Sequence, residues 1–590
     1  MRNFFKVMFL CLYLSNNSYL KADDESQKAL AIFKTNCSKC HKGAGSSSGA
    51  HFDVLDASTM TVGKNGKKPN IIPGNPDESY LLTRIKNKSM PPKDVTVRPS
   101  DEDVKIITEW IKKGAKPLVN NEAKRAYISW LDILTSVRND LQKLAVRDIK
   151  YIRYFSLVNF SNNAQTTSED LRLYRAALSK AINSLSWKPN IVLPRPIDKN
   201  QLIFAIDLRT LDWDDKKKVW QTMTNNYPYG LTLDSKENDE AESLFKIQNE
   251  ICKLTNCNIP IVRADWFVSN ATKPPIYHNI LSIPETASEL EKTVNVNVIN
   301  NLNRNVVNRA GFQISGISTQ NRLVERHDSS YGAYWKSYDF RPNNDFSLLT
   351  TYPLGPKYEG NLYQKQAFVH DGGEIIFNLP NGLQAYMLVN GKDKRIDNGP
   401  IEVVHDKQQS FSGTSVVSNG ISCMGCHKNG MLPIKDIIRQ GTALPGLLGD
   451  KVNALYPKPE KMTEFIEKDE KLFLTALKES VLPFVPEFAM DIDKLKKEMP
   501  EPITKLVMAH RDDNMTLAHV AAELDFKDLV ELKSVIKRSN NLIKLLPLCQ
   551  PNGTIKRAEW EKYETTIEGS LFQICANALG IGKPYTLNEN

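Results

Sequence analysis

Residues 37–41 read CSKCH, and residues 423–427, far downstream, read CMGCH. Both stretches have the form C-x-x-C-H. Two thiols at this spacing reach the two vinyl groups along one edge of a porphyrin and form thioethers, and the adjacent imidazole then binds the iron. The pattern therefore predicts two covalently attached haems of the c type.

Two other kinds of site also use paired cysteines. A zinc site needs two more Cys or His ligands at short spacing, and neither motif has them nearby. A thioredoxin-like dithiol belongs to a βαβ context and does not need the histidine. We therefore favour haem. The predicted attachment residues are Cys37, Cys40, Cys423 and Cys426, and the predicted iron ligands within the motifs are His41 and His427.

Strong local signals surround the first motif. A helical stretch over residues 23–37 leads into it, and a second helix is predicted over residues 101–113. Ser100 and Asp103 form a capping box for that helix, and Gly114 follows its end. The apolar residues expected on one face of this helix are Val104, Ile107, Trp110 and Ile111.

Residues 24–117 resemble the planctomycete-type cytochrome c domain of class I cytochromes. The resemblance implies an all-α domain in which Met90 is the distal iron ligand. A thioether is a soft, neutral ligand that raises the potential of a haem. Met60 is the rival, but it follows His41 too closely to reach around the haem. The residues that carry the resemblance are Cys37, Cys40, His41, the segment PGNPDES at 73–79, Leu82, Arg84, MPP at 90–92 and Trp110.

The second motif lacks these companion signals. Met431 lies only four residues after His427, so we expect it on the same side of the haem as that histidine. Nothing in the pattern selects a distal ligand, and an empty sixth position is equally admissible. The residues left open are Met462, Met490, Met499, His278, His327, His370 and His405.

The N-terminus reads as a secretory signal over residues 1–22, with Arg2 and Lys6 before a short apolar run. Eight apolar residues are too few to cross a bilayer, which needs about 20. We therefore expect a periplasmic or otherwise exported protein with no transmembrane segment after signal removal. With 41% hydrophobic residues and 25% charged residues the composition is globular, and a net charge of +9 without a dense basic block does not indicate nucleic acid binding.

The chain contains nine cysteines. One lies in the predicted signal peptide and four lie in the haem motifs. An oxidising compartment favours pairing of the remaining four. The predicted disulfides are Cys252–Cys257 and Cys549–Cys575.

The predicted fold is multidomain and mixed. Two Asn-Gly turns, at 381–382 and 390–391, separate apolar runs and indicate an antiparallel meander. Helices are expected over 171–185 and 235–254, and a strand over 201–208. The predicted organisation is a signal peptide (1–22), an all-α cytochrome c domain (23–120), a helical connector (121–145), an α+β domain with the meander (146–410) and a mainly α domain that carries the second haem motif (411–590).

No catalytic motif appears in the middle of the chain. The aromatic-rich stretch 322–340 favours a packed core over a redox relay, and His370 with Asp371 suits a turn better than an acid/base pair. His510 and His519 are nine residues apart, which is not a helical ligand spacing, so we predict structural roles for both. We predict an exported di-haem c-type cytochrome that transfers electrons to or from a redox partner protein. The alternatives are a haem enzyme, peroxidase-like or substrate-oxidising, with an open position on its second haem, and a haem sensor.

Overall fold

The computed structural model describes residues 24–585 with internal gaps, and the predicted signal peptide lies outside the described residues. The described residues form two compact units, an N-terminal unit within Met1–Lys124 and a C-terminal unit within Arg125–Asn590. The gaps are at 39, 42–53, 56, 62–68, 93–94, 96, 117, 119–124, 164–165, 215–217, 226, 234–238, 314, 316, 343, 346, 408, 410, 512–513, 551–552 and 564–568.

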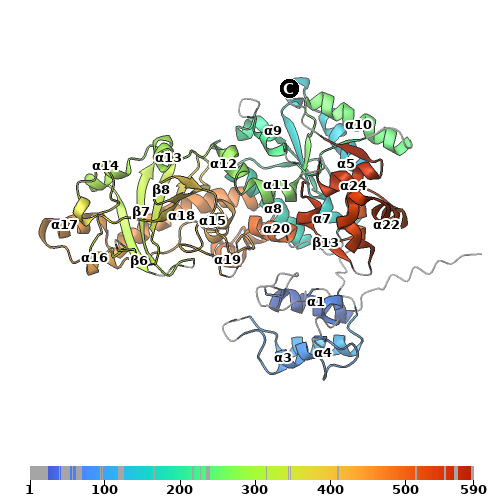
Figure 1. Cartoon of the computed structure of the whole chain (residues 1–590), viewed down its shortest axis with the longest axis horizontal. Coiled ribbons are helices and arrows are strands. Elements are labelled where there is room, and N and C mark those ends of the chain that lie inside the picture. The colour runs from blue at the N-terminus through green and yellow to red at the C-terminus, as the bar shows by residue number, and fades with distance from the viewer. Residues whose placement is uncertain are drawn as a thin grey trace, which may run out of the picture. The chain divides into compact units, whose positions relative to one another are not determined.

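The regular elements described in the N-terminal unit are helices (Figure 1). The predicted capping box is confirmed, because the Ser100 hydroxyl accepts from the Asp103 N–H and the Asp103 carboxylate accepts from the Ser100 N–H. Trp110 is buried and meets Phe33 edge to face, with ring centroids 5.5 Å apart. This contact joins the first helix to the last. The helices are α1 (Asp24–Asn36), α2 (Ala57–Thr61), α3 (Tyr80–Lys86) and α4 (Asp101–Lys112).

A six-stranded antiparallel sheet fills one end of the C-terminal unit, in the order β11-β10-β9-β8-β7-β6 (Figure 1). The predicted Asn381-Gly382 turn joins β9 to β10, and Gly382 has the positive φ of +89° that such a turn requires. The predicted meander is therefore confirmed. The strands are β6 (Asn308–Gln313), β7 (Asn321–Ser329), β8 (Gly332–Asp339), β9 (Gly372–Asn378), β10 (Gln384–Asn390) and β11 (Arg395–Ile396).

A smaller sheet of order β2-β3-β1-β5 lies in the other part of this unit. Strands β1 and β5 are parallel, and their last residues, Ser156 and Arg263, are register partners. The predicted helices over 171–185 and 235–254 are confirmed as α8 and α10. The elements are β1 (Ile152–Ser156), β2 (Arg195–Pro196), β3 (Ile203–Asp207), β5 (Ile261–Arg263), α5 (Trp130–Leu141), α6 (Val146–Ile149), α7 (Val158–Asn162), α8 (Ser168–Ser184), α9 (Val219–Thr224), α10 (Asp239–Thr255) and α11 (Ala264–Ala271).

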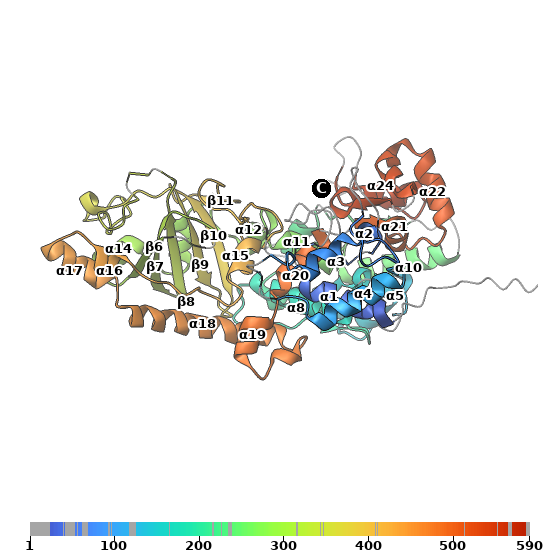
Figure 2. The same ribbon diagram turned by 90° about the horizontal axis from the view of Figure 1, so that it is seen from below.

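The last third of the chain is mainly helical, as predicted, and it packs on both sheets. The long helix α18 (Pro459–Val481) runs beside the six-stranded sheet (Figure 2) and contacts both β8 and α8. Two short ribbons, β12–β13 and β4–β14, complete the fold. The remaining helices are α12 (Ile276–Leu281), α13 (Ala287–Thr293), α14 (Val298–Asn303), α15 (Ile421–Cys426), α16 (Ile438–Gly441), α17 (Gly446–Leu455), α19 (Ile492–Glu498), α20 (Pro502–Arg511), α21 (Leu517–Glu523), α22 (Leu529–Arg538), α23 (Arg557–Trp560) and α24 (Leu571–Ala578). The ribbon strands are β4 (Leu231–Leu233), β12 (Asn514–Thr516), β13 (Thr554–Lys556) and β14 (Gly582–Pro584).

Neither predicted disulfide is present, since all eight described cysteines are free thiols. The thiol of Cys252 turns to the carbonyl of Asn258, 3.6 Å away. Cys575 is buried in the apolar core, whereas the Cys549 sulfur lies 3.9 Å from the carbonyl of Lys533. Within the described part of the chain, no helix has both the length and the apolar character needed to span a membrane.

Candidate functional site

The first C-x-x-C-H motif lies where helix α1 ends. The carbonyl of Cys37 accepts hydrogen bonds from the N–H groups of Cys40 and His41, at 3.1 and 3.0 Å. Three side chains therefore leave the backbone from a single turn. All three are half-buried, and Cys37 packs against the apolar core of the N-terminal unit. Two thiols that are not in a disulfide and an imidazole beside an apolar core are a donor set that fits a covalently bound haem.

Burial determines the electrostatics of this first site. Desolvation and the neighbouring Cys40 raise the pKa of the Cys37 thiol to about 12. Burial lowers the pKa of His41. Both groups are therefore uncharged near neutral pH, and a neutral imidazole is the form that binds a metal.

The structure places Met60 and Met90 differently. Met90 is half-buried, and its N–H donates to the carbonyl of Arg84 at 3.0 Å, which holds the loop against the end of α3. Met60 is fully buried in the core. Met90 as distal ligand stays a prediction.

The second motif lies on the short helix α15, inside the C-terminal unit. The N-cap residue of helix α15 is Gly420, whose φ is +82°. A Cβ at that position would lie 2.4 Å from the carbonyl oxygen of Thr272, so only glycine fits. The N–H of His427 donates to the carbonyl of Cys423 at 2.8 Å. This is the same turn that Cys37 and His41 make.

His427 is oriented by its own loop. Its Nδ1 lies 3.1 Å from the carbonyl oxygen of Gly430, which can only accept, so Nδ1 carries the proton. The other nitrogen, Nε2, is left to face the Glu374 carboxylate of β9, 3.7 Å away. A ring nitrogen held by a backbone carbonyl, with the opposite nitrogen turned away from the backbone, is how proteins orient a histidine toward a metal.

Glu374 is the centre of the second site. The Cys423 thiol hydrogen-bonds to it, and burial together with this negative charge raises the pKa of Cys423 well above its usual value. Burial and Glu374 also raise the pKa of Cys426 to about 12. Burial alone would raise the pKa of Glu374, but the hydrogen bond and charge of His427 lower it. Both thiols and the imidazole therefore converge on one buried carboxylate.

Sequence reasoning missed Glu374 and the residues beside it. The ring of Tyr386, from β10, lies 6.3 Å from the ring of His427. Arg322, from β7, forms a buried ion pair with Asp339 and lies near Cys426. Residues from the sheet thus meet residues from the helical region at this motif. The only nearby feature of the sequence that singles out Glu374 is the Gly372-Gly373 pair, which precedes it at the start of a strand.

The other candidate ligands have partners of their own. His327 lies 3.1 Å from Glu325 and 3.0 Å from Asn301. His278 lies 2.6 Å from the side chain of Asn419. Met490 is 97% exposed, which removes it as a ligand in this conformation.

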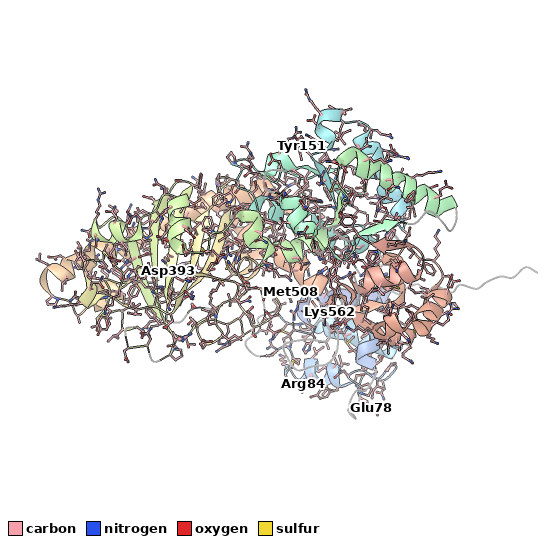
Figure 3. The ribbon with its side chains drawn as sticks, turned by 45° about the horizontal axis from the view of Figure 1, so that its top comes forward. Glu78, Arg84, Tyr151, Asp393, Met508 and Lys562 are labelled. Carbon is pink, nitrogen blue, oxygen red and sulfur yellow. The ribbon has the colours of Figure 1, made fainter. Side chains whose placement is uncertain are left out.

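His370 and Asp371 do not form an acid/base pair, which agrees with the preferred interpretation that each has hydrogen-bond partners of its own. His370 turns to Asp393, which Figure 3 labels, with Nε2 3.5 Å from its carboxylate. Asp371 instead accepts from the N–H of Arg341 and from the side chain of Asn344. Adjacent residues on an extended segment point to opposite sides, which separates the two groups. The aromatic side chains of β8 are buried as core residues.

Comparison with known families bears on the N-terminal unit. Residues 37–94 match the family model described as Planctomycete cytochrome C. This match supports a cytochrome c-like domain at the N-terminus, with the covalent haem c and the electron transfer that such a domain implies. The second motif lies outside the matched residues. No curated protein and no solved structure matches the chain.

Proposed function

We propose that this chain is an exported di-haem c-type cytochrome that passes electrons between a redox partner protein and a second, internal haem. One observation carries the second haem: residues 423–427 repeat the turn of residues 37–41, with the histidine N–H on the carbonyl of the first cysteine. The Nε2 atom of His427 and the thiols of Cys423 and Cys426, neither of which is in a disulfide, would supply the attachment chemistry.

A haem at each motif would supply a one-electron carrier. The protein's own residues determine its properties. In the N-terminal unit, Cys37 and Cys40 would attach the group, and His41 would bind its iron. Met90, before two prolines, is the proposed distal ligand; its neutral thioether raises the potential of a haem. Half-buried motif residues suit exchange with a partner at the surface.

In the C-terminal unit, Cys423, Cys426 and His427 have the corresponding roles. Gly430 holds the imidazole in one orientation through its carbonyl. Glu374 lies 3.7 Å from Nε2 of His427, so a haem held by this motif would have a buried carboxylate in its surroundings. A carboxylate stabilises ferric iron by charge. We therefore propose that the second haem has the lower potential of the two.

A peroxide-reducing or substrate-oxidising enzyme is the second candidate. Glu374 favours it, since a buried carboxylate beside the motif histidine is placed to accept or return a proton. Electron paramagnetic resonance separates the two candidates. Two low-spin six-coordinate haems support the electron carrier, and a stable high-spin haem supports the enzyme.

The haem count tests the main proposal. The full chain is produced in a host that matures c-type cytochromes, and the intact mass is measured. We expect two covalent haems in the wild type, one in the double variant Cys423→Ser/Cys426→Ser, and two in the matched control Cys252→Ser/Cys257→Ser. A wild type with a single haem would overturn the proposal. Sequencing of the mature N-terminus tests export, with cleavage after residue 22 expected.

A further inference from the structure

A cavity of about 220 Å³ lies in the C-terminal unit, at the carboxyl ends of the parallel strands β1 and β5. Ser156 and Arg263, the last residues of these strands, both line it. In α/β sheets this edge is where ligands bind, because the loops and helices that follow the strands leave a crevice there. Neither haem motif contributes to this cavity.

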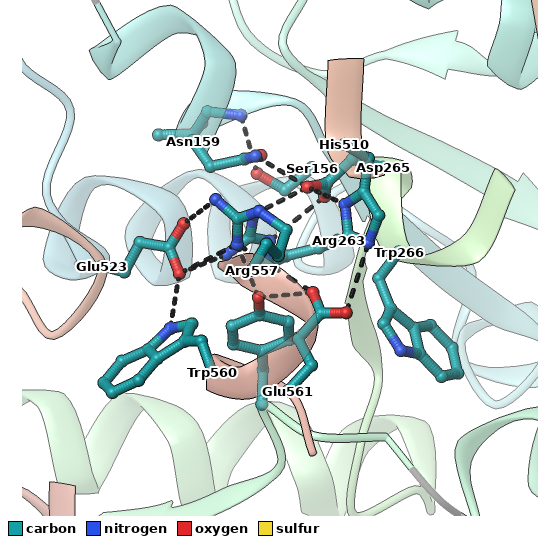
Figure 4. A network of polar contacts seen from close by, with 12 residues as sticks. Ser156, Asn159, Arg263, Asp265, Trp266, His510, Glu523, Arg557, Trp560 and Glu561 are labelled. Carbon is teal, nitrogen blue, oxygen red and sulfur yellow. Dashed lines mark hydrogen bonds and ion pairs between the residues drawn. The ribbon is translucent and has the colours of Figure 1, made fainter. Parts of the chain in front are cut away.

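The charged groups on one side of the cavity form a closed network (Figure 4). Glu523 pairs with both Arg263 and Arg557, at 2.7 Å each. Arg263 also pairs with Asp265 at 2.7 Å, and the Trp560 indole donates to Glu523 at 3.0 Å.

His510 completes this network. It lies 3.0 Å from Asp265 and 3.2 Å from Glu561. Burial alone would lower its pKa, but the charge of Glu561 and hydrogen bonds to both carboxylates raise it to about 9. Three cations therefore face three carboxylates in direct contact. A charged ligand would have to displace one of these buried partners, so the network favours an uncharged ligand.

One residue of the wall carries a buried polar atom that lacks a partner. Asn159 lines the cavity, and its Nδ2 donates to Asp265 at 3.0 Å, which determines which side-chain atom is the oxygen. The Oδ1 atom is buried and has no hydrogen-bond partner among the described residues. A buried acceptor without a partner costs free energy, and a ligand O–H or N–H would satisfy it.

Aromatic side chains also line the cavity, and one of them, Tyr229, contacts the network directly. Arg557 donates to the Tyr229 hydroxyl at 2.7 Å, and that hydroxyl donates to Glu561 at 2.6 Å. The ring of Phe572 lies 4.9 Å from that of Tyr229 and 6.3 Å from that of Trp130. All three residues line the cavity. An apolar cavity of roughly 150 Å³ holds one benzene molecule, so about 220 Å³ accepts one ring with a small substituent.

We propose that this cavity binds a small uncharged aromatic molecule bearing a hydroxyl group, a phenol or an aromatic alcohol. Its ring packs against Phe572 and Tyr229, and its hydroxyl donates to Oδ1 of Asn159. The site belongs to the C-terminal unit alone and does not depend on the haem count.

Calorimetric titration of the full-length haem-loaded protein tests the proposal, with phenol, toluene and benzoate as probes. We expect phenol to bind about tenfold more tightly than toluene, the value of one well-placed hydrogen bond. Benzoate is expected to bind at least about tenfold more weakly than phenol, because it would unbalance the buried charges. The Soret band is expected not to shift, since the site is not at a haem.

Two variants and a control locate the site. Asn159→Ala is expected to reduce phenol binding to the level of toluene, and Ala522→Leu, which fills the cavity from α21, is expected to abolish binding of both. Asn453→Ala is the matched control, because Asn453 is an exposed asparagine on a helix. We expect it to leave the binding of phenol and of toluene unchanged. The proposal is overturned if no probe binds, if benzoate binds as tightly as phenol, if Asn159→Ala weakens toluene as much as phenol, or if binding shifts the Soret band.

Discussion

The two C-x-x-C-H motifs have the same backbone turn in different surroundings. Cys37 and His41 are half-buried beside a small helical core, whereas Cys423 is 2% exposed and His427 8% exposed. Around the second motif lie a buried carboxylate, Glu374, and a buried ion pair, Arg322–Asp339. The same local sequence thus builds the same turn, while distant residues determine its charge environment. The predictions below test how far this difference extends.

The largest effect is expected from Arg322→Met. This change leaves Asp339 buried without its cation, which costs about 3–5 kcal/mol in the free energy of unfolding. Thermal or denaturant unfolding followed by the near-ultraviolet signal of the C-terminal unit measures it. The visible spectrum of the N-terminal haem is expected to stay unchanged. If the N-terminal unit unfolds in the same transition, the expectation that Arg322 stabilises only the C-terminal unit is contradicted.

Gly420→Ala is expected to have the next largest effect. The added Cβ would lie 2.4 Å from the carbonyl oxygen of Thr272, and the backbone at Gly420 is left-handed. We expect these two effects together to lower the free energy of unfolding by about 2–4 kcal/mol.

The N-terminal unit offers a matched control in Gly114→Ala. Its φ is +95° but nothing lies within 4 Å of the added Cβ, so we expect a cost of about 1 kcal/mol. If both variants lose the same free energy of unfolding, the backbone around Gly420 moves in solution to make room for the added Cβ.

The stability of the C-terminal unit is expected to fall above neutral pH. His510 has its pKa raised from 6.5 to about 9 on folding, so its protonated form is favoured in the folded state. The resulting stabilisation is complete below pH 6.5 and is lost as the pH rises through about 9; its size is on the order of 2–3 kcal/mol. Unfolding midpoints in urea across this range measure it. In the variant His510→Gln, the unfolding midpoint is expected to stay constant across this pH range. If the midpoint still falls with pH, another group causes the effect.

Ser100→Ala gives the smallest effect. It removes the N-cap of α4 and is expected to cost about 1 kcal/mol in the N-terminal unit. A chemical unfolding curve read at the Trp110 fluorescence measures it. Ser288→Ala, at the first turn of α13, should change neither the Trp110 transition nor its midpoint.

Short-range features could be predicted from sequence because neighbouring residues determine them. The capping box at Ser100 and Asp103, the Asn381-Gly382 turn and helix α8 all appear where the pattern indicated. Each depends on hydrogen bonds or apolar spacing within a few residues.

Long-range partners could not be predicted in this way. Glu374 meets His427 only because the register of the meander places β9 beside α15. Arg263, Glu523 and Arg557 come from three distant segments, and no local pattern marks them as partners. The predicted disulfides failed for a related reason: proximity in sequence or on neighbouring helices does not determine which way a thiol turns.

The burial of Cys423 has a consequence for biogenesis. Thioether formation needs the thiol, the vinyl group and the maturation machinery in contact, and a side chain that is 2% exposed offers no such access. Under the proposed function, the second haem is therefore attached while residues 423–427 are still unfolded, and strands β7 to β10 close around it afterwards. The N-terminal motif, with half-buried thiols, carries no such constraint. The order of assembly thus follows from where each cysteine lies.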